Sequence, residues 1–127
     1  MDTDAPERDV DGYAIIGACF EVYNEMGNGY LEEVYQESLE LELHDRGIPF
    51  ITKPKLPIFY KGGPLRKHYE ADLIVFDHII VELKAVKTLL PEHEAQLLNY
   101  LKATGHRVGY LVNFGAFPKL DWRRRIK

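Results

Sequence analysis

Apolar residues recur at helical spacing in the first part of the chain. Between Val10 and Met26 they fall every three or four positions, which predicts a helix. The segment Gly27-Asn28-Gly29 favours a turn, because glycine and asparagine tolerate a positive φ. A second apolar stripe from Tyr30 to about Arg46 predicts another helix, and Gly47 is typical of a helix C-terminus.

After Gly47 the pattern changes to short β-rich runs separated by prolines and by the turn Lys61-Gly62-Gly63-Pro64. The last two runs before the next helix are joined tightly around Asp77. Pro91 is a favoured first residue of a helix. The basic segment 123–127 is expected to be a tail. The predicted elements are strands over residues 48–52, 56–60, 66–76, 79–85 and 107–113, with a helix from Pro91 to about Ala103.

The order of these elements predicts an α/β fold. The chain has 127 residues, of which 46% are hydrophobic and 28% charged, as in ordinary soluble domains. We expect residues 1–8 to form a flexible tail and residues 9–127 to form a single domain. The sequence shows neither a long apolar run nor a signal-peptide pattern, so we expect no membrane partner and a cytoplasmic location.

Charge is divided unevenly along the chain. Residues 1–48 carry a net charge of −11, whereas residues 49–127 carry +7. A basic half is expected of a surface that contacts phosphate groups. The alternative is that these charges only solvate exposed faces.

Two carboxylates, Asp72 and Glu82, interrupt runs that otherwise have the pattern of buried strands. A buried carboxylate without a partner is costly, and a divalent cation removes the repulsion between two of them. Side chains alternate along a strand, so Glu82 and Lys84 share a face. Asp72 comes opposite Glu82 only if the connection has an odd number of residues, and we therefore predict a three-residue loop over 76–78.

Asp72 followed by Glu82-Leu83-Lys84 resembles the PD-(D/E)XK signature of restriction-type and repair nucleases, with Ala71 in place of the proline. The segment Gly29-Tyr30-Leu31-Glu32-Glu33-Val34-Tyr35 matches the motif of the GxxExxY family of small bacterial and archaeal proteins. The resemblance, which extends from Ile15 to Gly115, implies a restriction-endonuclease-like αβββαβ core. In this fold a mixed central sheet is flanked by helices, here with an extra N-terminal helix.

The resemblance also implies roles for single residues. Asp72 and Glu82 would hold Mg²⁺, and Lys84 would position or activate the attacking water. Gln96 and Tyr100 lie four residues apart on one helix face and resemble the QxxxY motif of RecB-like nucleases. Glu32 resembles the helical glutamate of the same branch. The alternative for Gln96 and Tyr100 is an ordinary pair at the boundary of an amphipathic helix. The alternative for Glu32 is a favourable interaction with the helix dipole.

The predicted function is therefore metal-dependent hydrolysis of phosphodiester bonds in DNA or, as the less favoured partner, RNA. Mg²⁺, or Mn²⁺, would be held by Asp72, Glu82 and the main-chain carbonyl of Leu83. Cutting both strands of a duplex would favour a homodimer, because one chain offers one site. Basic side chains are expected to contact the flanking phosphates; they are Lys53, Lys55, Lys87, His93 and Lys102.

Two other functions fit the same sequence. The protein could be a nuclease-fold module that binds nucleic acid without cleaving it, or an assembly or regulatory protein on the same fold. Binding that persists in EDTA without product would favour the first. Absence of salt-dependent nucleic-acid binding would favour the second.

Overall fold

The computed structural model describes residues 9–127; residues 1–8, expected to be a flexible tail, lie outside the described residues. The helices are α1 (Val10–Met26), α2 (Glu32–Asp45) and α3 (Pro91–Thr104). The strands are β1 (Phe50–Thr52), β2 (Lys55–Tyr60), β3 (Gly63–Glu70), β4 (Leu73–Val75), β5 (Ile79–Lys84), β6 (Val108–Asn113) and β7 (Asp121–Ile126). None of these helices combines the length and the apolar character that crossing a membrane requires.

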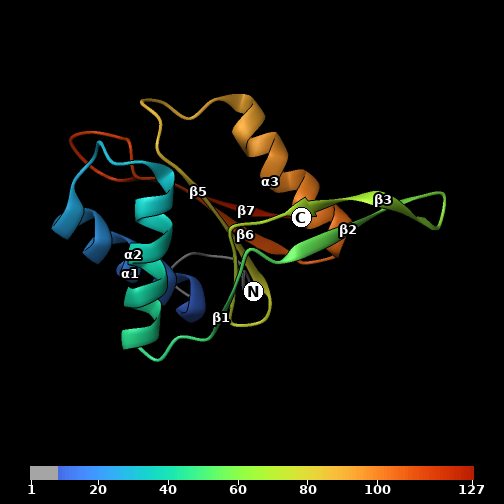
Figure 1. Ribbon diagram of the computed structural model, residues 1–127, viewed down its shortest axis with the longest axis horizontal. Coiled ribbons are helices and arrows are strands. Elements are labelled where there is room, and N and C mark those ends of the chain that lie inside the picture. Colours follow the sequence, from blue (N-terminus) through green and yellow to red (C-terminus); the bar gives the residue numbers. More distant parts are fainter. Residues whose placement is uncertain (1–8) are drawn as a thin grey trace.

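A mixed five-stranded sheet forms the centre of the fold, with the strand order β1-β4-β5-β6-β7. Its one parallel pair is β5 with β6, and α3 connects these two strands. α1 and α2 pack against one face of the sheet and α3 against the other (Figure 1). The expected α/β fold, a mixed central sheet flanked by helices, is confirmed.

Side-chain alternation in β5 assigns each residue to one of the two cores. Val81 and Leu83 belong to the cluster beneath α1 and α2, whereas Ile80 belongs to the cluster beneath α3. Since alternate residues of a strand share a face, Glu82 and Lys84 lie on the α3 side with Ile80. The polar positions of this strand therefore face the helix that carries the predicted QxxxY pair.

The β4–β5 connection determines where Asp72 lies. Leu73 pairs with Val81 and Val75 with Ile79, so that the loop consists of residues 76–78. The prediction of a three-residue loop is confirmed. Because Asp72 directly precedes β4, this register brings it opposite Glu82.

The predicted single strand over residues 66–76 is wrong. The chain leaves the strand conformation at Ala71-Asp72, and β3 pairs with β2 in a separate two-stranded sheet. The physical reason lies in the main chain of Asp72. Its N–H donates to the Glu82 side chain, and its carbonyl accepts from the Lys53 main chain and the Gln36 side chain, so these groups are satisfied outside a ladder.

The prediction of a basic tail over residues 123–127 is also wrong, because residues 123–126 belong to β7, which pairs with β6 along its whole length. The arginines are paired with carboxylates, one of them in the same strand, because Arg123 forms an ion pair with Asp121 at 3.2 Å. Arg123 and Arg125 form ion pairs with Glu94 of α3, and Arg124 pairs with Asp9. A charged segment can therefore serve as an edge strand at this position.

Candidate active site

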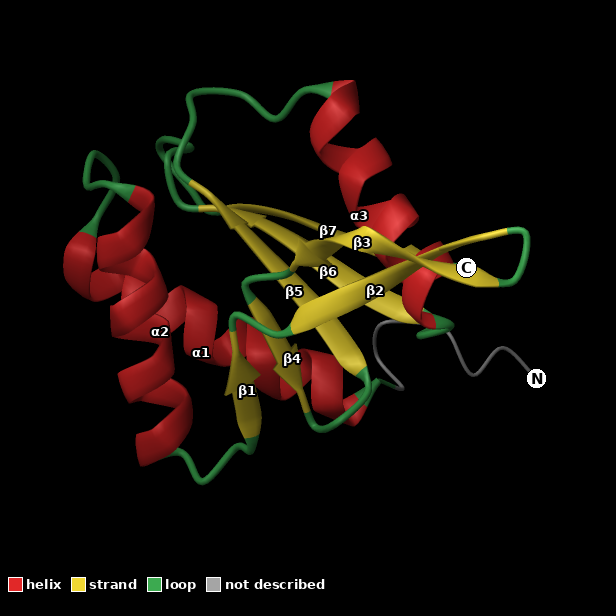
Figure 2. Ribbon diagram, turned by 45° about the vertical axis from the view of Figure 1, so that its right-hand side comes forward, coloured by secondary structure: helices red, strands yellow, loops and turns green. Residues whose placement is uncertain are grey.

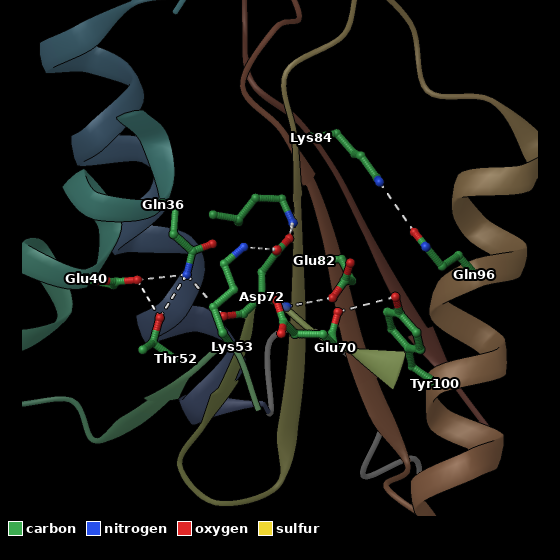
Figure 3. Close-up of polar contacts among 11 residues, drawn as sticks. Gln36, Glu40, Thr52, Lys53, Glu70, Asp72, Glu82, Lys84, Gln96 and Tyr100 are labelled. Atoms are coloured by element: carbon green, nitrogen blue, oxygen red, sulfur yellow. Dashed lines mark hydrogen bonds and ion pairs between the residues drawn. The ribbon is translucent and has the colours of Figure 1, made fainter. Parts of the chain in front are cut away.

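The site is centred on two buried carboxylates, Asp72 with 7% of its surface exposed and Glu82 with 4%. The main-chain N–H of Asp72 donates to Glu82 Oε1 at 2.9 Å, and that of Leu83 donates to Asp72 Oδ2 at 2.7 Å (Figure 3). Each carboxylate is thus bound by the main chain of the segment that carries the other. These two bonds fix both side chains on the α3 side of the sheet.

The Glu82 carboxyl group is strongly perturbed. Burial, followed by the negative charge of Asp72, raises its pKa to about 8. The bond from the Asp72 N–H and the positive charge of Lys84 lower the pKa, but they do not offset the burial. At neutral pH Glu82 therefore retains a proton, which a metal ion bound by both carboxylates would replace.

Lys53 is the cation in direct contact with this pair. Its Nζ lies 3.0 Å from Asp72 Oδ1, and its main-chain N–H donates to the Asp72 carbonyl at 2.9 Å. Burial lowers the pKa of Lys53, but the hydrogen bond to Asp72 and the charge of Asp72 raise it by a larger amount. The net shift of the Lys53 pKa is therefore upward. Lys53 was expected to contact phosphate, and its contact in the structure is with Asp72.

Lys84 contacts Gln96 between β5 and α3, and Tyr100 lies one turn after Gln96 in the same helix. Lys84 Nζ donates to Gln96 Oε1 at 3.3 Å. The Tyr100 hydroxyl donates to the Glu70 carbonyl at 3.4 Å, at the end of β3. Burial, and then the charges of Glu82 and Asp72, raise the pKa of Tyr100 to about 12, so its hydroxyl stays protonated at neutral pH.

α2 contributes two residues from the opposite side of the site. Glu32 lies in its first turn, and burial followed by the charge of Asp72 raises the pKa of Glu32. One turn later, Gln36 Nε2 donates to the Asp72 carbonyl at 3.0 Å, to Thr52 Oγ1 at 3.2 Å and to Glu40 Oε2 at 2.8 Å. Gln36 thereby ties α2 to the segment that positions Asp72.

Gln36 was not predicted from the sequence. It lies four residues after Glu32 and four before Glu40, a spacing that places all three on one face of a helix. This polar stripe, beside the apolar stripe of the same helix, is the feature of the sequence from which Gln36 could have been predicted. Within residues 9–127, Gln36 Oε1 is the one buried side-chain oxygen or nitrogen without a hydrogen-bond partner.

The other predicted phosphate contacts are more dispersed. Lys55, Lys87 and Lys102 are exposed. His93 Nδ1 accepts a hydrogen bond from the Leu90 N–H at 3.0 Å, so this side chain caps the start of α3. Their contacts with nucleic acid stay predictions.

The protein ligands available to a metal are few. In the part of the chain that the structure describes, no three His, Cys, Asp or Glu side chains lie close enough to hold an ion together. The carboxylates of Asp72 and Glu82 form a partial set of hard oxygen ligands. Such a set suits Mg²⁺, which keeps several waters or substrate oxygens among its ligands.

A family model for the PD-(D/E)XK nuclease superfamily matches residues 9–125. The chain belongs to the PD-(D/E)XK nuclease superfamily. Asp72 and the segment Glu82-Leu83-Lys84 resemble the superfamily signature in sequence, and Asp72 is hydrogen-bonded to Glu82 and Leu83 in the structure. Membership of the narrower GxxExxY family stays a prediction. No curated protein sequence matches the chain.

Two solved structures share the PD-(D/E)XK fold of this chain. The crystal structure of SSO0001 has a TM-score of 0.61 at 21% identity and covers 75% of this chain, which spans about half (49%) of that one. An alkaline exonuclease (LHK-Exo) from Laribacter hongkongensis has a TM-score of 0.54 at 13% identity, over 98% of this chain and 72% of that one. At these identities the comparison concerns the fold.

Proposed function

We propose that this protein is a divalent-metal-dependent nuclease that hydrolyses phosphodiester bonds in DNA. One observation carries the proposal. Asp72 and Glu82 are bound across the β4–β5 pair, with Lys84 two residues further along the same face of β5. The membership of a nuclease superfamily supports the reaction class, since the signature residues meet in space.

The residues present fit a hard divalent cation. Asp72, Glu82 and the Leu83 main-chain carbonyl would hold Mg²⁺ or Mn²⁺, and the ion would displace the proton that Glu82 retains at neutral pH because its pKa is raised. The bound ion would lower the pKa of a water and neutralise charge on the scissile phosphate. Glu32 lies close enough to Asp72 for their charges to interact, so it would hold or orient groups at the edge of the same site.

The reaction is an addition of water to phosphorus. The P–O bond to the leaving oxygen breaks, and a proton ends on that oxygen. Lys84 would orient the attacking water and stabilise negative charge that develops on the phosphate. Gln96 holds the Lys84 ammonium group, and Tyr100 keeps its hydroxyl proton and can donate to a phosphate oxygen.

The substrate is proposed to be DNA, with RNA as the alternative. One chain carries one such site, so cleavage of both strands of a duplex would involve two copies. The basic residues Lys55, Lys87 and Lys102 would contact flanking phosphates, which provides affinity without reading the sequence.

The test is cleavage of labelled single-stranded, duplex, flapped and branched DNA and RNA in Mg²⁺, in Mn²⁺ and in EDTA. Lys84→Ala is expected to lower the metal-dependent rate by about 10²–10³, the usual effect of removing one group that stabilises transition-state charge. Lys119→Ala, which removes an exposed lysine of the β6–β7 connection that has no role in the proposal, is the matched control and should cleave like the wild type. Equal rates for all three proteins would contradict the role of Lys84. Binding without cleavage would instead favour the non-catalytic binding module.

A further inference from the structure

The β2–β3 hairpin projects from the body of the protein (Figure 2). Its base is anchored beside the site, where Leu56 is 4% exposed and packs in the α3 cluster. The rings of Tyr69 and Tyr100 meet edge to face there, with centroids 4.7 Å apart. A strand of eight residues spans roughly 20–25 Å, so the hairpin extends about that far from the site.

The outer part of the hairpin exposes large apolar side chains. Phe59 is 56% exposed, Tyr60 63% and Leu65 48%. Exposing adjacent aromatic residues forfeits the gain of burying them, so their position at the end of a projecting arm calls for a ligand with flat apolar faces. Unpaired nucleobases are such a ligand, and stacking on aromatic side chains is how proteins bind single strands.

The charge of the hairpin selects the same ligand. From residue 55 to residue 69 the chain contains no carboxylate and four cationic side chains, Lys55, Lys61, Arg66 and Lys67. Within residues 9–127 none of the four forms an ion pair, and all four are exposed. Unneutralised cations interleaved with exposed aromatic rings are complementary to a phosphate backbone and its bases.

A groove leads from this arm toward α3. It has a volume of about 330 Å³ and lies between the hairpin and the C-terminal half of the helix; it is lined by Ile58, Phe59, Tyr69, Asn99, Lys102 and Ala103. Lys102 adds a cation on the helix side of the groove. Tyr69, which lines this groove, contacts the ring of Tyr100, so the groove ends beside a residue of the proposed site.

We infer that the β2–β3 hairpin is a binding arm for an unpaired strand of nucleic acid, which Phe59 and Tyr60 stack upon and which the four hairpin cations hold by its phosphates. The arm would lead this strand to the Asp72–Glu82 site. The inference extends the proposed nuclease function, and it rests on that function for the cleavage of the bound strand. Its binding test does not depend on cleavage.

The test measures binding of a labelled 20-nucleotide thymidine oligomer and of a blunt duplex of the same length, by fluorescence anisotropy in EDTA. The double variant Phe59→Ala/Tyr60→Ala is expected to bind the single strand about 10- to 100-fold more weakly. Phe59→Trp/Tyr60→Trp should restore binding. Tyr13→Ala, which removes an aromatic side chain that is 78% exposed on α1, should leave affinity within about twofold of wild type.

Two further measurements examine the mechanism of binding. In Tyr60→Trp the new indole fluorescence, corrected for that of Trp122, should be quenched by the oligomer because the ring stacks on a base. The variant Lys61→Gln/Arg66→Gln/Lys67→Gln should make the plot of log K against log salt shallower by about 2, from a slope of about 0.7 per phosphate contact.

The outcomes separate this inference from the nuclease proposal. The inference of a binding arm is wrong if the double variant binds like the wild type, or if the duplex binds more tightly than the single strand. Either result would contradict it even where the wild type cleaves. If the wild type does not cleave but the double variant loses binding, the arm stands and the nuclease proposal fails. A wild-type protein that binds neither probe overturns the arm.

Discussion

Lys53 Nζ lies 3.0 Å from Asp72 Oδ1, so the lysine ammonium group binds an oxygen that a metal ion at this site would also use. Its backbone is in the left-handed region, with φ at 49°, a conformation that non-glycine residues adopt where the surroundings require it. The main chain and the side chain of Lys53 therefore both bind Asp72. This cation partly neutralises the carboxylate pair.

Lys53→Met is expected to act in opposite directions on two measured quantities. Without the cation, a metal ion meets no competitor and less repulsion at Asp72, so the half-saturating Mn²⁺ concentration in calorimetric titrations should fall several-fold. In EDTA, the free energy of unfolding should fall by about 1 kcal/mol, because a half-exposed ion pair is screened by solvent. Lys55→Met, which does not contact Asp72, is the control. Weaker Mn²⁺ binding by Lys53→Met would contradict this account.

The raised pKa of Glu82 predicts a pH-dependent stability for the metal-free protein. In the unfolded chain Glu82 releases its proton near pH 4.5, whereas in the folded protein it keeps the proton up to about pH 8. The folded state thus binds more protons in this window, so stability from this group is present below pH 4.5 and is lost as pH rises to 8.

Glu82→Gln should remove this dependence. Urea unfolding in EDTA at pH 5.5 and pH 8 should show the wild type losing on the order of 1–3 kcal/mol relative to the variant between the two values. A parallel pH dependence in both proteins would show that Glu82 ionises in the folded state as it does in the unfolded chain.

Two glycines of α1 predict opposite effects on stability. A Cβ atom at Gly12 would lie 1.9 Å from the Tyr110 hydroxyl, which donates to Asp9 Oδ2 at 2.6 Å. At Gly17 the nearest side-chain atom is at 3.5 Å, an ordinary contact. In urea unfolding, Gly12→Ala should cost about 1–3 kcal/mol, whereas Gly17→Ala should stabilise the helix by about 0.5–1 kcal/mol. A neutral Gly12→Ala would show that Tyr110 moves without cost.

The central geometry of the site was predictable because side-chain alternation in strands is strict. Once Asp72 and Glu82 are required to face each other, the parity of the β4–β5 connection follows, and the structure has that loop. The same alternation places Lys84 on the face of Glu82, whereas its contact with Gln96 was not predicted. The apolar repeat ending at the Gly27-Asn28-Gly29 turn located α1 nearly to the residue, and Pro91 located the start of α3.

The parts that were missed depend on contacts between distant segments. Lys53 and Gln36 reach Asp72 because β1 pairs with β4 and α2 packs over that edge, and no local pattern specifies which strand edges meet. The strand β7 contains three consecutive arginines, which pair with Asp121 of the same strand and with Glu94 and Asp9 from far along the chain. A solvated tail has the same local composition as such a strand.

The most direct test of the proposed site is the rate of metal-dependent cleavage by Asp72→Asn in single turnover, with saturating enzyme and Mg²⁺. Asp77→Asn makes the same chemical change at an exposed position of the β4–β5 loop and serves as the control. We predict that Asp72→Asn cleaves about 100-fold or more slowly than the wild type, whereas Asp77→Asn cleaves at the wild-type rate. An Asp72→Asn protein that cleaves with an undiminished metal-dependent rate would contradict the assignment of this site.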